Sequence, residues 1–430
     1  MNEDSKNIKG LYVHIPFCDG KCFYCAFYSR PYESKLARRY LSALPVELKQ
    51  YPRFKAETVY FGGGTPSLLT RSELQSLCNL IKNNVSAGCI KEWTIECNPR
   101  SLTPEKLSLL AKDGINRVSL GAQSFEDSAL QWLGRRHSVA DIHDAVQMIK
   151  SAGFDNFGLD LIACIPGFKP DVWLKTLSAA IALAPKHISI YALTREEGSR
   201  LAREIGEKSI GIKSTTINPL VGRDSLVPPC LNRSDCRTGS PALPVKAISS
   251  RYKTGSTNSA SHHQINLLSE DEEIDALDLA EKILTREGYK RYEISNYARP
   301  GYECLHNLDC WRGREYIGLG PAAASHVGLK RWTNLPDLGK YLQAVEQGKR
   351  PPRSADALNA RLKKLEMIVF GLRLAEGISE ATGKIRAQRL RELCEEGLVT
   401  NINGRWRLTK RGFYLADYVG RELLAGRNAE

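Results

Sequence analysis

Three cysteines near the start of the chain are spaced closely enough to hold one inorganic centre. Cys18, Cys22 and Cys25 form the pattern C-x3-C-x2-C directly after an apolar run. Soft thiolates on one loop suit zinc or an iron–sulfur cluster. Structural zinc usually takes four ligands in paired sets, and no second C-x2-C follows at zinc-finger spacing. Three thiolates leave one iron of a cubane open for chemistry, so the pattern favours a [4Fe–4S] cluster. Structural zinc or unpaired thiols are the alternative.

The elements that must position this loop alternate between two patterns. Stretches with apolar residues at helical spacing separate short apolar runs that are rich in Val, Ile, Tyr and Leu. These runs occupy residues 11–15, 58–62, 92–97, 117–121, 158–163 and 188–193. Such alternation indicates βαβ units and a parallel sheet. Six units in series favour an α/β barrel or partial barrel over an open dinucleotide-binding sheet.

The cysteine loop resembles the signature of the radical S-adenosylmethionine (SAM) superfamily, C-x3-C-x-aromatic-C, with Tyr24 in the aromatic place. The resemblance implies a partial (β/α)6 TIM-like barrel with the cluster after the first strand, at the end of the barrel where chemistry is usually found. It also implies that SAM binds the open iron through its amino and carboxylate groups. A reduced cluster then releases a 5′-deoxyadenosyl radical, so an electron donor is required.

The resemblance extends to positions that contact SAM in the superfamily. Residues 62–66 read GGGTP after the second apolar run, where glycine lets the backbone approach a ligand closely. The positions that the resemblance assigns to SAM are Tyr12, Gly63, Gly64, Thr65, Glu96, Gln123, Arg135, Asp160 and Ala192. For each position taken singly, a structural role at a strand end is the alternative explanation.

Longer motifs narrow the resemblance to one family. HIPFC, GGGTPS, ECNPRSL, LGAQSF and YEISNYARPGYECLHN resemble the family that joins oxygen-independent coproporphyrinogen III dehydrogenase to a heme chaperone branch. The dehydrogenase has a further cysteine where this chain has Phe27, and a long N-terminal segment, whereas Cys18 lies close to the start here. Both differences favour the chaperone branch, which implies heme binding and transfer to an acceptor protein. Radical decarboxylation of coproporphyrinogen III is the alternative.

A second motif concerns heme itself. The chaperone branch carries HNxxYW, which reads HNLDCW here and makes His306 the candidate heme ligand. Imidazole is a common axial ligand of heme iron. Cys310 replaces the usual Tyr of this motif, and Ala324 replaces a His of the usual GLGAGAHS, with His326 close by but out of register. A core or turn histidine is the alternative role for His306.

The remaining chain divides by composition. We expect the barrel to occupy residues 1–208 and a Ser-, Thr- and Pro-rich insertion, largely disordered, to occupy 209–266. A barrel-associated segment with the heme motif follows at 267–348. Residues 349–430 read as helices around a short hairpin with an Asn-Gly turn, which predicts a small winged-helix-like α+β domain.

Charge leaves one further function open. The net charge of +13 favours anionic partners, heme propionates among them, without selecting one. Arg405, Arg407, Lys410 and Arg411 lie in or near the predicted wing, so nucleic-acid binding is a third and least favoured function. The N-terminus is polar and the apolar runs are too short to cross a bilayer, so we expect a cytoplasmic protein.

Overall fold

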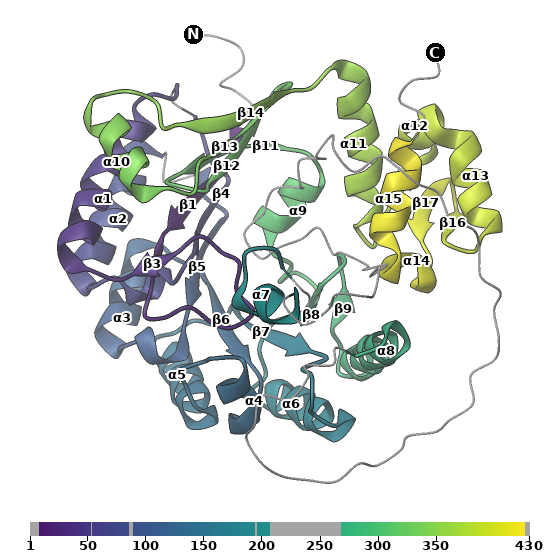
Figure 1. Ribbon diagram of the computed structural model, residues 1–430, viewed down its shortest axis with the longest axis horizontal. Coiled ribbons are helices and arrows are strands. Elements are labelled where there is room, and N and C mark those ends of the chain that lie inside the picture. The colour runs from purple at the N-terminus through teal and green to yellow at the C-terminus, as the bar shows by residue number, and fades with distance from the viewer. Residues whose placement is uncertain (1–7, 53, 86–88, 194–195, 207–267, 426–430) are drawn as a thin grey trace.

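The computed structural model describes residues 8–425 except 53, 86–88, 194–195 and 207–267. Among these residues, twelve strands form one sheet (Figure 1). In chain order they are β1 (Ile8–Ile15), β4 (Thr58–Gly63), β5 (Glu92–Cys97), β6 (Arg117–Gln123), β7 (Phe157–Ala163), β8 (His187–Ala192), β9 (Lys290–Arg291), β10 (Asn296–Ala298), β11 (Glu315–Leu319), β12 (Ala324–Val327), β13 (Lys330–Asn334) and β14 (Arg353–Ala357).

The centre of the sheet is a parallel array, in the order β1, β4, β5, β6, β7 and β8. These are the six apolar runs of the sequence, so the predicted α/β partial barrel is confirmed. Parallel strands are covered on both faces, which explains why the runs are almost continuously apolar and why β1 and β4 are almost wholly buried.

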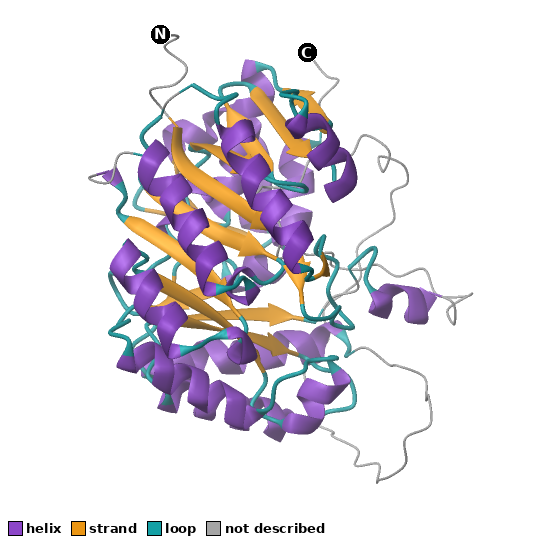
Figure 2. Cartoon of the chain, turned by 90° about the vertical axis from the view of Figure 1, so that its left-hand side faces the viewer, coloured by secondary structure: helices purple, strands orange, loops and turns teal. Residues whose placement is uncertain are grey.

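Helices cover the outer face of this array (Figures 1 and 2). The outer helices are α1 (Ser34–Leu48), α2 (Arg71–Asn84), α3 (Pro104–Asp113), α4 (Asp127–Trp132), α5 (Val139–Ser151) and α6 (Pro170–Ala182), whereas α7 (Arg200–Gly206) lies against the cysteine loop, where the Leu201 amide donates to the Phe23 carbonyl. Local residue types determine where these helices begin and end. Thr70 and Glu73 form a capping box at the start of α2, and Gly114 adopts a left-handed conformation after α3.

Both edges of the array are extended by later parts of the chain. β11 pairs with β1 in parallel and leads to the antiparallel strands β12, β13 and β14, whereas β10 pairs with β8 antiparallel. The connecting helices are α8 (Glu270–Arg286), α9 (Leu305–Trp311) and α10 (Leu338–Glu346). The sequence did not predict these edges. The predicted insertion at 209–266 lies outside the described residues.

The end of the chain has a hydrophobic core of its own, built around Ile368, Leu390, Leu393 and Leu423. Its elements are α11 (Ala360–Leu372), β15 (Ile378–Ser379), α12 (Glu380–Gly383), α13 (Ala387–Glu395), β16 (Val399–Ile402), β17 (Arg405–Leu408), α14 (Lys410–Tyr414) and α15 (Ala416–Leu424). Its three strands run β15-β17-β16, so the predicted small α+β domain with a short hairpin is confirmed. Within the described parts of the chain, no helix is both long and apolar enough to cross a bilayer.

Candidate functional site

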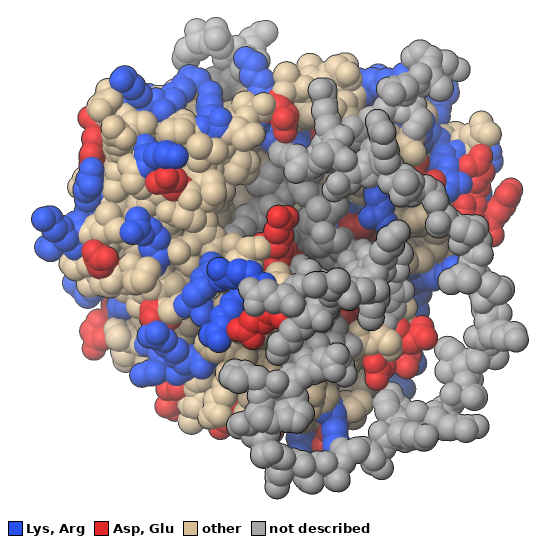
Figure 3. Space-filling model, viewed as in Figure 1, with Lys and Arg blue, Asp and Glu red and all other residues tan. Residues whose placement is uncertain are grey.

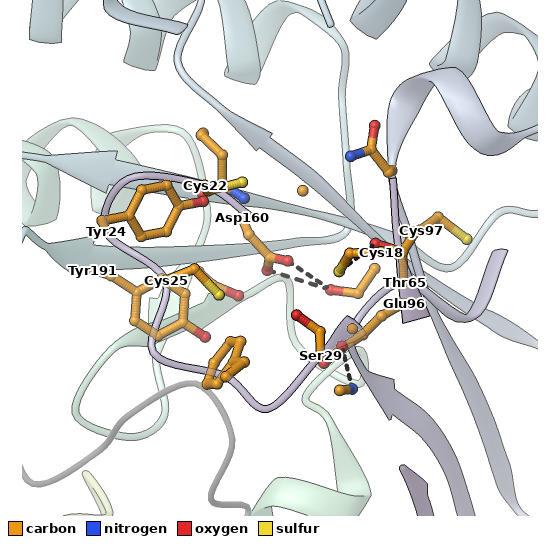
Figure 4. Close-up of a pocket in the computed structure, with 18 of the residues that line it drawn as sticks. Cys18, Cys22, Tyr24, Cys25, Ser29, Thr65, Glu96, Cys97, Asp160 and Tyr191 are labelled. Carbon is orange, nitrogen blue, oxygen red and sulfur yellow. Dashed lines mark hydrogen bonds between the residues drawn. The ribbon is translucent and has the colours of Figure 1, made fainter. Parts of the chain in front are cut away.

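The cysteine loop closes one end of a cavity that extends into the barrel. A short parallel pair, β2 (Phe17–Cys18) and β3 (Arg30–Pro31), holds the two ends of this loop together. Predicted residues from five parallel strands or the turns that follow them line the same cavity: Cys18, Cys22, Cys25, Gly63, Gly64, Thr65, Glu96, Gln123, Arg135 and Asp160. Separate stretches of sequence therefore meet at one site (Figure 4).

The three thiols are partly exposed and line this cavity together. The Cys18 sulfur lies 3.5 Å from the Thr65 hydroxyl, and an Arg135 Nη1–H donates to the Cys22 sulfur at 3.4 Å. Burial raises the pKa of the Cys18 thiol, so the free protein keeps this proton until a metal displaces it. Hydrogen bonds and a cation beside thiolates stabilise the negative charge of an iron–sulfur cluster. This donor set fits a cluster.

A single-ion site is a different arrangement. Among the residues that the structure describes, no three His, Cys, Asp or Glu side chains are grouped so that they could hold one metal ion. A cubane does not require such a group, because each thiolate binds a different iron at a different corner. The three cysteines line one open cavity, which is compatible with a cluster.

The glycine turn after β4 brings backbone close to the cysteine loop. The amide of Gly64 donates to the Ile15 carbonyl at 2.8 Å, and that of Thr65 donates to the Phe17 carbonyl at 2.7 Å. A Cβ on Gly64 would lie only 2.5 Å from the Phe17 oxygen, and Gly63 has a φ of 106°. Both positions therefore require glycine, and they leave the turn backbone open to the cavity.

Acidic side chains stand near the end of β5 and in the middle of β7. The Glu96 carboxylate accepts hydrogen bonds from the Tyr60 hydroxyl at 2.8 Å and from the Gly63 amide at 3.1 Å. Asp160 accepts from the Ser119 hydroxyl at 3.3 Å. Two fixed carboxylates in one cavity suit a cationic ligand group such as an ammonium or a sulfonium.

Two predicted SAM positions do not line the cavity. Tyr12 is buried in β1, where its hydroxyl lies 3.1 Å from His14 Nδ1 and its ring stacks with Tyr60. Ala192 ends β8 beside Tyr191, which does line the cavity. No observation assigns or removes a SAM contact for either residue, and both stay predictions.

His306 lies beneath the cavity in the floor of the barrel. It is 1% exposed, and its Nδ1 lies 2.8 Å from the Thr58 hydroxyl while its ring packs against Tyr60. Burial, aided by the charge of Arg117, lowers its pKa to about 3, so the imidazole is neutral. The structure thus gives His306 the packing of a core histidine, and its role as heme ligand stays a prediction.

Three other residues of the heme motif face the cavity. Asn307, Cys310 and Trp311 line it, while His306 does not. Cys310 packs against Ala324, so the two departures from the family pattern are neighbours. His326 does not line the cavity.

Sequence reasoning missed several cavity residues that carry polar chemistry. Arg117 starts β6, His187 starts β8, and Glu293 belongs to the YEISN motif. All three are almost fully buried. A charged residue at the start of an otherwise apolar parallel strand was the available signal for Arg117, because such positions are seldom filled by arginine without a specific role.

Comparison with known proteins defines the family. Residues 12–180 match the radical SAM superfamily. The heme chaperone HemW of Lactococcus lactis is 28% identical over 422 residues, which are 96% of each chain. The heme chaperone HemW of Mycobacterium tuberculosis is 30% identical over 96% of this chain and 94% of its own. This chain belongs to the heme chaperone HemW family. The predicted branch is therefore confirmed.

A solved structure supports the fold. The chain is similar to coproporphyrinogen III oxidase (HemN) from Escherichia coli, with a TM-score of 0.74 and 20% identity over 97% of this chain and 90% of that one. At this identity the likeness concerns the fold. The superfamily's cofactors are a [4Fe–4S] cluster and SAM, so both predicted cofactors are confirmed for the chain as a member of it.

Proposed function

We propose that this protein is a heme chaperone, which binds a [4Fe–4S] cluster, SAM and heme and passes heme to an acceptor protein in the cytoplasm. The observation that carries the proposal is the likeness over nearly the full length to relatives named as heme chaperones. All ten cysteines in the described parts of the chain are free thiols, as is usual in a reducing compartment.

In this proposal Cys18, Cys22 and Cys25 hold the cluster, and an electron donor reduces it. The turn at residues 63–65, with Glu96 and Asp160, orients SAM at the open iron. When bound, the cluster supplies one-electron chemistry to SAM. The remaining wall of the cavity, beside α9, is available to the tetrapyrrole.

Anaerobic reconstitution tests the cluster. We expect iron and acid-labile sulfide in the wild type and a large loss of both in Cys22→Ala. Cys394→Ala is the matched control, because Cys394 is an exposed thiol outside the cavity. Zinc in place of iron and sulfide in anaerobically purified protein would remove the cluster from the proposal.

Heme titration of His306→Ala tests the predicted ligand. Thr58→Val is the control, because it removes the hydrogen bond to the imidazole but keeps the ring. If His306 ligates the iron, His306→Ala alone changes the Soret band. Equal losses of affinity in both variants with an unchanged band would give His306 a structural role.

The alternative enzyme is tested on the same sample. Phe27 lines the cavity where the dehydrogenase has its further cysteine, which favours the chaperone. We therefore expect no carbon dioxide release from coproporphyrinogen III with SAM and reductant. Release at turnover would reverse the order of the two functions.

Basic residues near the predicted wing have partners within the protein, which argues against nucleic-acid binding. Arg405 donates to the carbonyls of Glu376 and Gly377, and Lys410 pairs with Asp278 at 2.5 Å. Basic and acidic side chains are interspersed over the face seen in Figure 3. We expect no salt-dependent binding of DNA or RNA at low ionic strength.

A further inference from the structure

The inner part of the cavity contains a buried cation that lacks a hydrogen-bonding partner among the described residues. Arg117 is 2% exposed and lines the cavity. Within that part of the chain, its guanidinium makes no hydrogen bond and no ion pair within 4 Å, and its Nε is buried without a partner. An arginine is always charged, and a buried charge without hydrogen bonds is costly. A ligand that enters the cavity can relieve this cost.

The carboxylate that attracts Arg117 is committed elsewhere. Glu92 contributes a favourable charge, but its oxygens accept from the amides of Leu305 at 2.8 Å and His306 at 3.1 Å at the start of α9. Glu92 therefore fixes the helix, and the donors of Arg117 remain available. By contrast, Arg331, which is equally buried, pairs with Glu366 at 2.6 Å.

Two neighbours in the cavity wall also have unused polar atoms. The Oδ1 of Asn307 and the Nδ1 of His187 are buried and have no hydrogen-bond partner in the portion of the chain that the structure describes. Both residues line the cavity with Arg117. The other ring nitrogen of His187 lies 2.8 Å from the Tyr292 hydroxyl, which fixes the imidazole in place. The inner cavity thus has one cation and one imidazole whose Nδ1 can donate to an anionic ligand when its Nε2 accepts from Tyr292, whereas the Oδ1 of Asn307 can only accept.

We propose that Arg117, assisted by the Nδ1 of His187, binds a carboxylate of the tetrapyrrole, namely one propionate of heme. The proposal rests on heme as ligand of the proposed function and names the part of the cavity that recognises it. A planar guanidinium matches a carboxylate through two parallel hydrogen bonds.

Paired titrations with heme and heme dimethyl ester test this site, because esterification removes both carboxylates and keeps the macrocycle. We expect the wild type to bind heme about 10- to 100-fold more tightly than the ester, the range for a charge-assisted pair. Arg117→Gln should bind both with similar affinity. The control Arg331→Gln, which changes a buried arginine outside the cavity, should keep the preference of the wild type.

Three outcomes would contradict the proposal that Arg117 binds a propionate. Arg117→Gln could keep the wild-type preference for heme, in which case heme binds without Arg117 and only this inference fails. SAM affinity could fall in Arg117→Gln while the preference stays, which would assign Arg117 to the carboxylate of SAM. Wild-type protein could bind neither porphyrin, and the proposed function would then fail as well.

Thermal unfolding without ligands separates binding from a structural role. Because Arg117 has no hydrogen-bonding partner among the residues described, Arg117→Gln should unfold at the wild-type temperature or above it. Arg331→Gln leaves Glu366 unpaired and should unfold at a lower temperature. A comparable fall for Arg117→Gln would show that this arginine supports the fold, which would contradict the proposal.

Discussion

Replacing Glu293 by glutamine should remove a pH dependence from the stability of the ligand-free protein. Glu293 is 1% exposed, lines the cavity, and accepts from the Trp311 indole N–H at 3.1 Å and the Ser295 amide at 3.3 Å. Burial raises the pKa of its carboxyl from 4.5 to about 7, because these hydrogen bonds offset only part of the lost solvation. The folded protein therefore holds this proton more tightly than the unfolded chain does.

The direction and size of the pH dependence of stability follow from this difference in pKa between the folded and unfolded states. Below about pH 4.5 the carboxyl is protonated in both states and its full stabilisation is present, whereas stability is lost as the pH rises through about 7. The loss amounts to about 3 kcal/mol, at about 1.4 kcal/mol for each tenfold difference in acidity. A neutral amide at this position mimics the protonated acid at every pH, so Glu293→Gln should gain this amount over the wild type at neutral pH.

Urea unfolding from about pH 5 to 8 measures the effect as the difference between variant and wild type. Glu287→Gln controls for the loss of one negative charge, because Glu287 is exposed. A difference between Glu293→Gln and the wild type that stays constant across this range would refute the reasoning. A lower stability of the variant at pH 8 would show that ionised Glu293 is compensated by a charge within the cavity.

Three further predictions concern the walls of the cavity. Gly64→Ala places a Cβ 2.5 Å from a backbone carbonyl oxygen, so it should lower the free energy of unfolding by about 1–3 kcal/mol and weaken SAM binding. Urea unfolding and calorimetry measure the two effects. The control Gly339→Ala meets only the end of an aspartate side chain and should change stability little. Arg135→Met removes the cation 3.4 Å from the Cys22 sulfur and should lower the reduction potential of a reconstituted cluster by about 50–100 mV in an anaerobic titration; an unchanged potential would exclude this influence. Glu92→Gln weakens the hydrogen bonds from two backbone amides at the start of α9 and should lower the free energy of unfolding by about 1.5–3 kcal/mol. Equal urea midpoints for the variant and the wild type would contradict this prediction.

The parallel strands and the glycine turn could be predicted from the sequence because their causes are local. A strand buried on both faces requires a nearly continuous apolar run, as in β1 and β4. Gly64 sits where any side chain would meet backbone, so its residue type records the close approach of two loops. Both features can be recognised in the sequence even when the segment that packs against them is unknown.

The edges of the sheet and the inner cavity could not be predicted in this way. β11 pairs with β1 although about 300 residues separate Leu319 from Val13, and nothing in either segment specifies the other. The orientation of His306 depends on Glu92, which fixes the start of α9 through its backbone amides. Arg117 became recognisable as unpartnered only when its neighbours in the described part of the chain were known.

The position of α9 links the C-terminal domain to the cavity. Its first turn is bound to Glu92 in the barrel floor, and its last residue, Trp311, both lines the cavity and packs with Phe370 in the core of the C-terminal domain. The Trp311 indole also donates to Glu293 across the cavity wall. Displacing the C-terminal domain would move this tryptophan and expose the carboxylate beside it. The domain therefore supports the wall of the ligand cavity that Trp311 forms, although none of its own described residues lines the cavity, and this packing role requires no nucleic-acid partner.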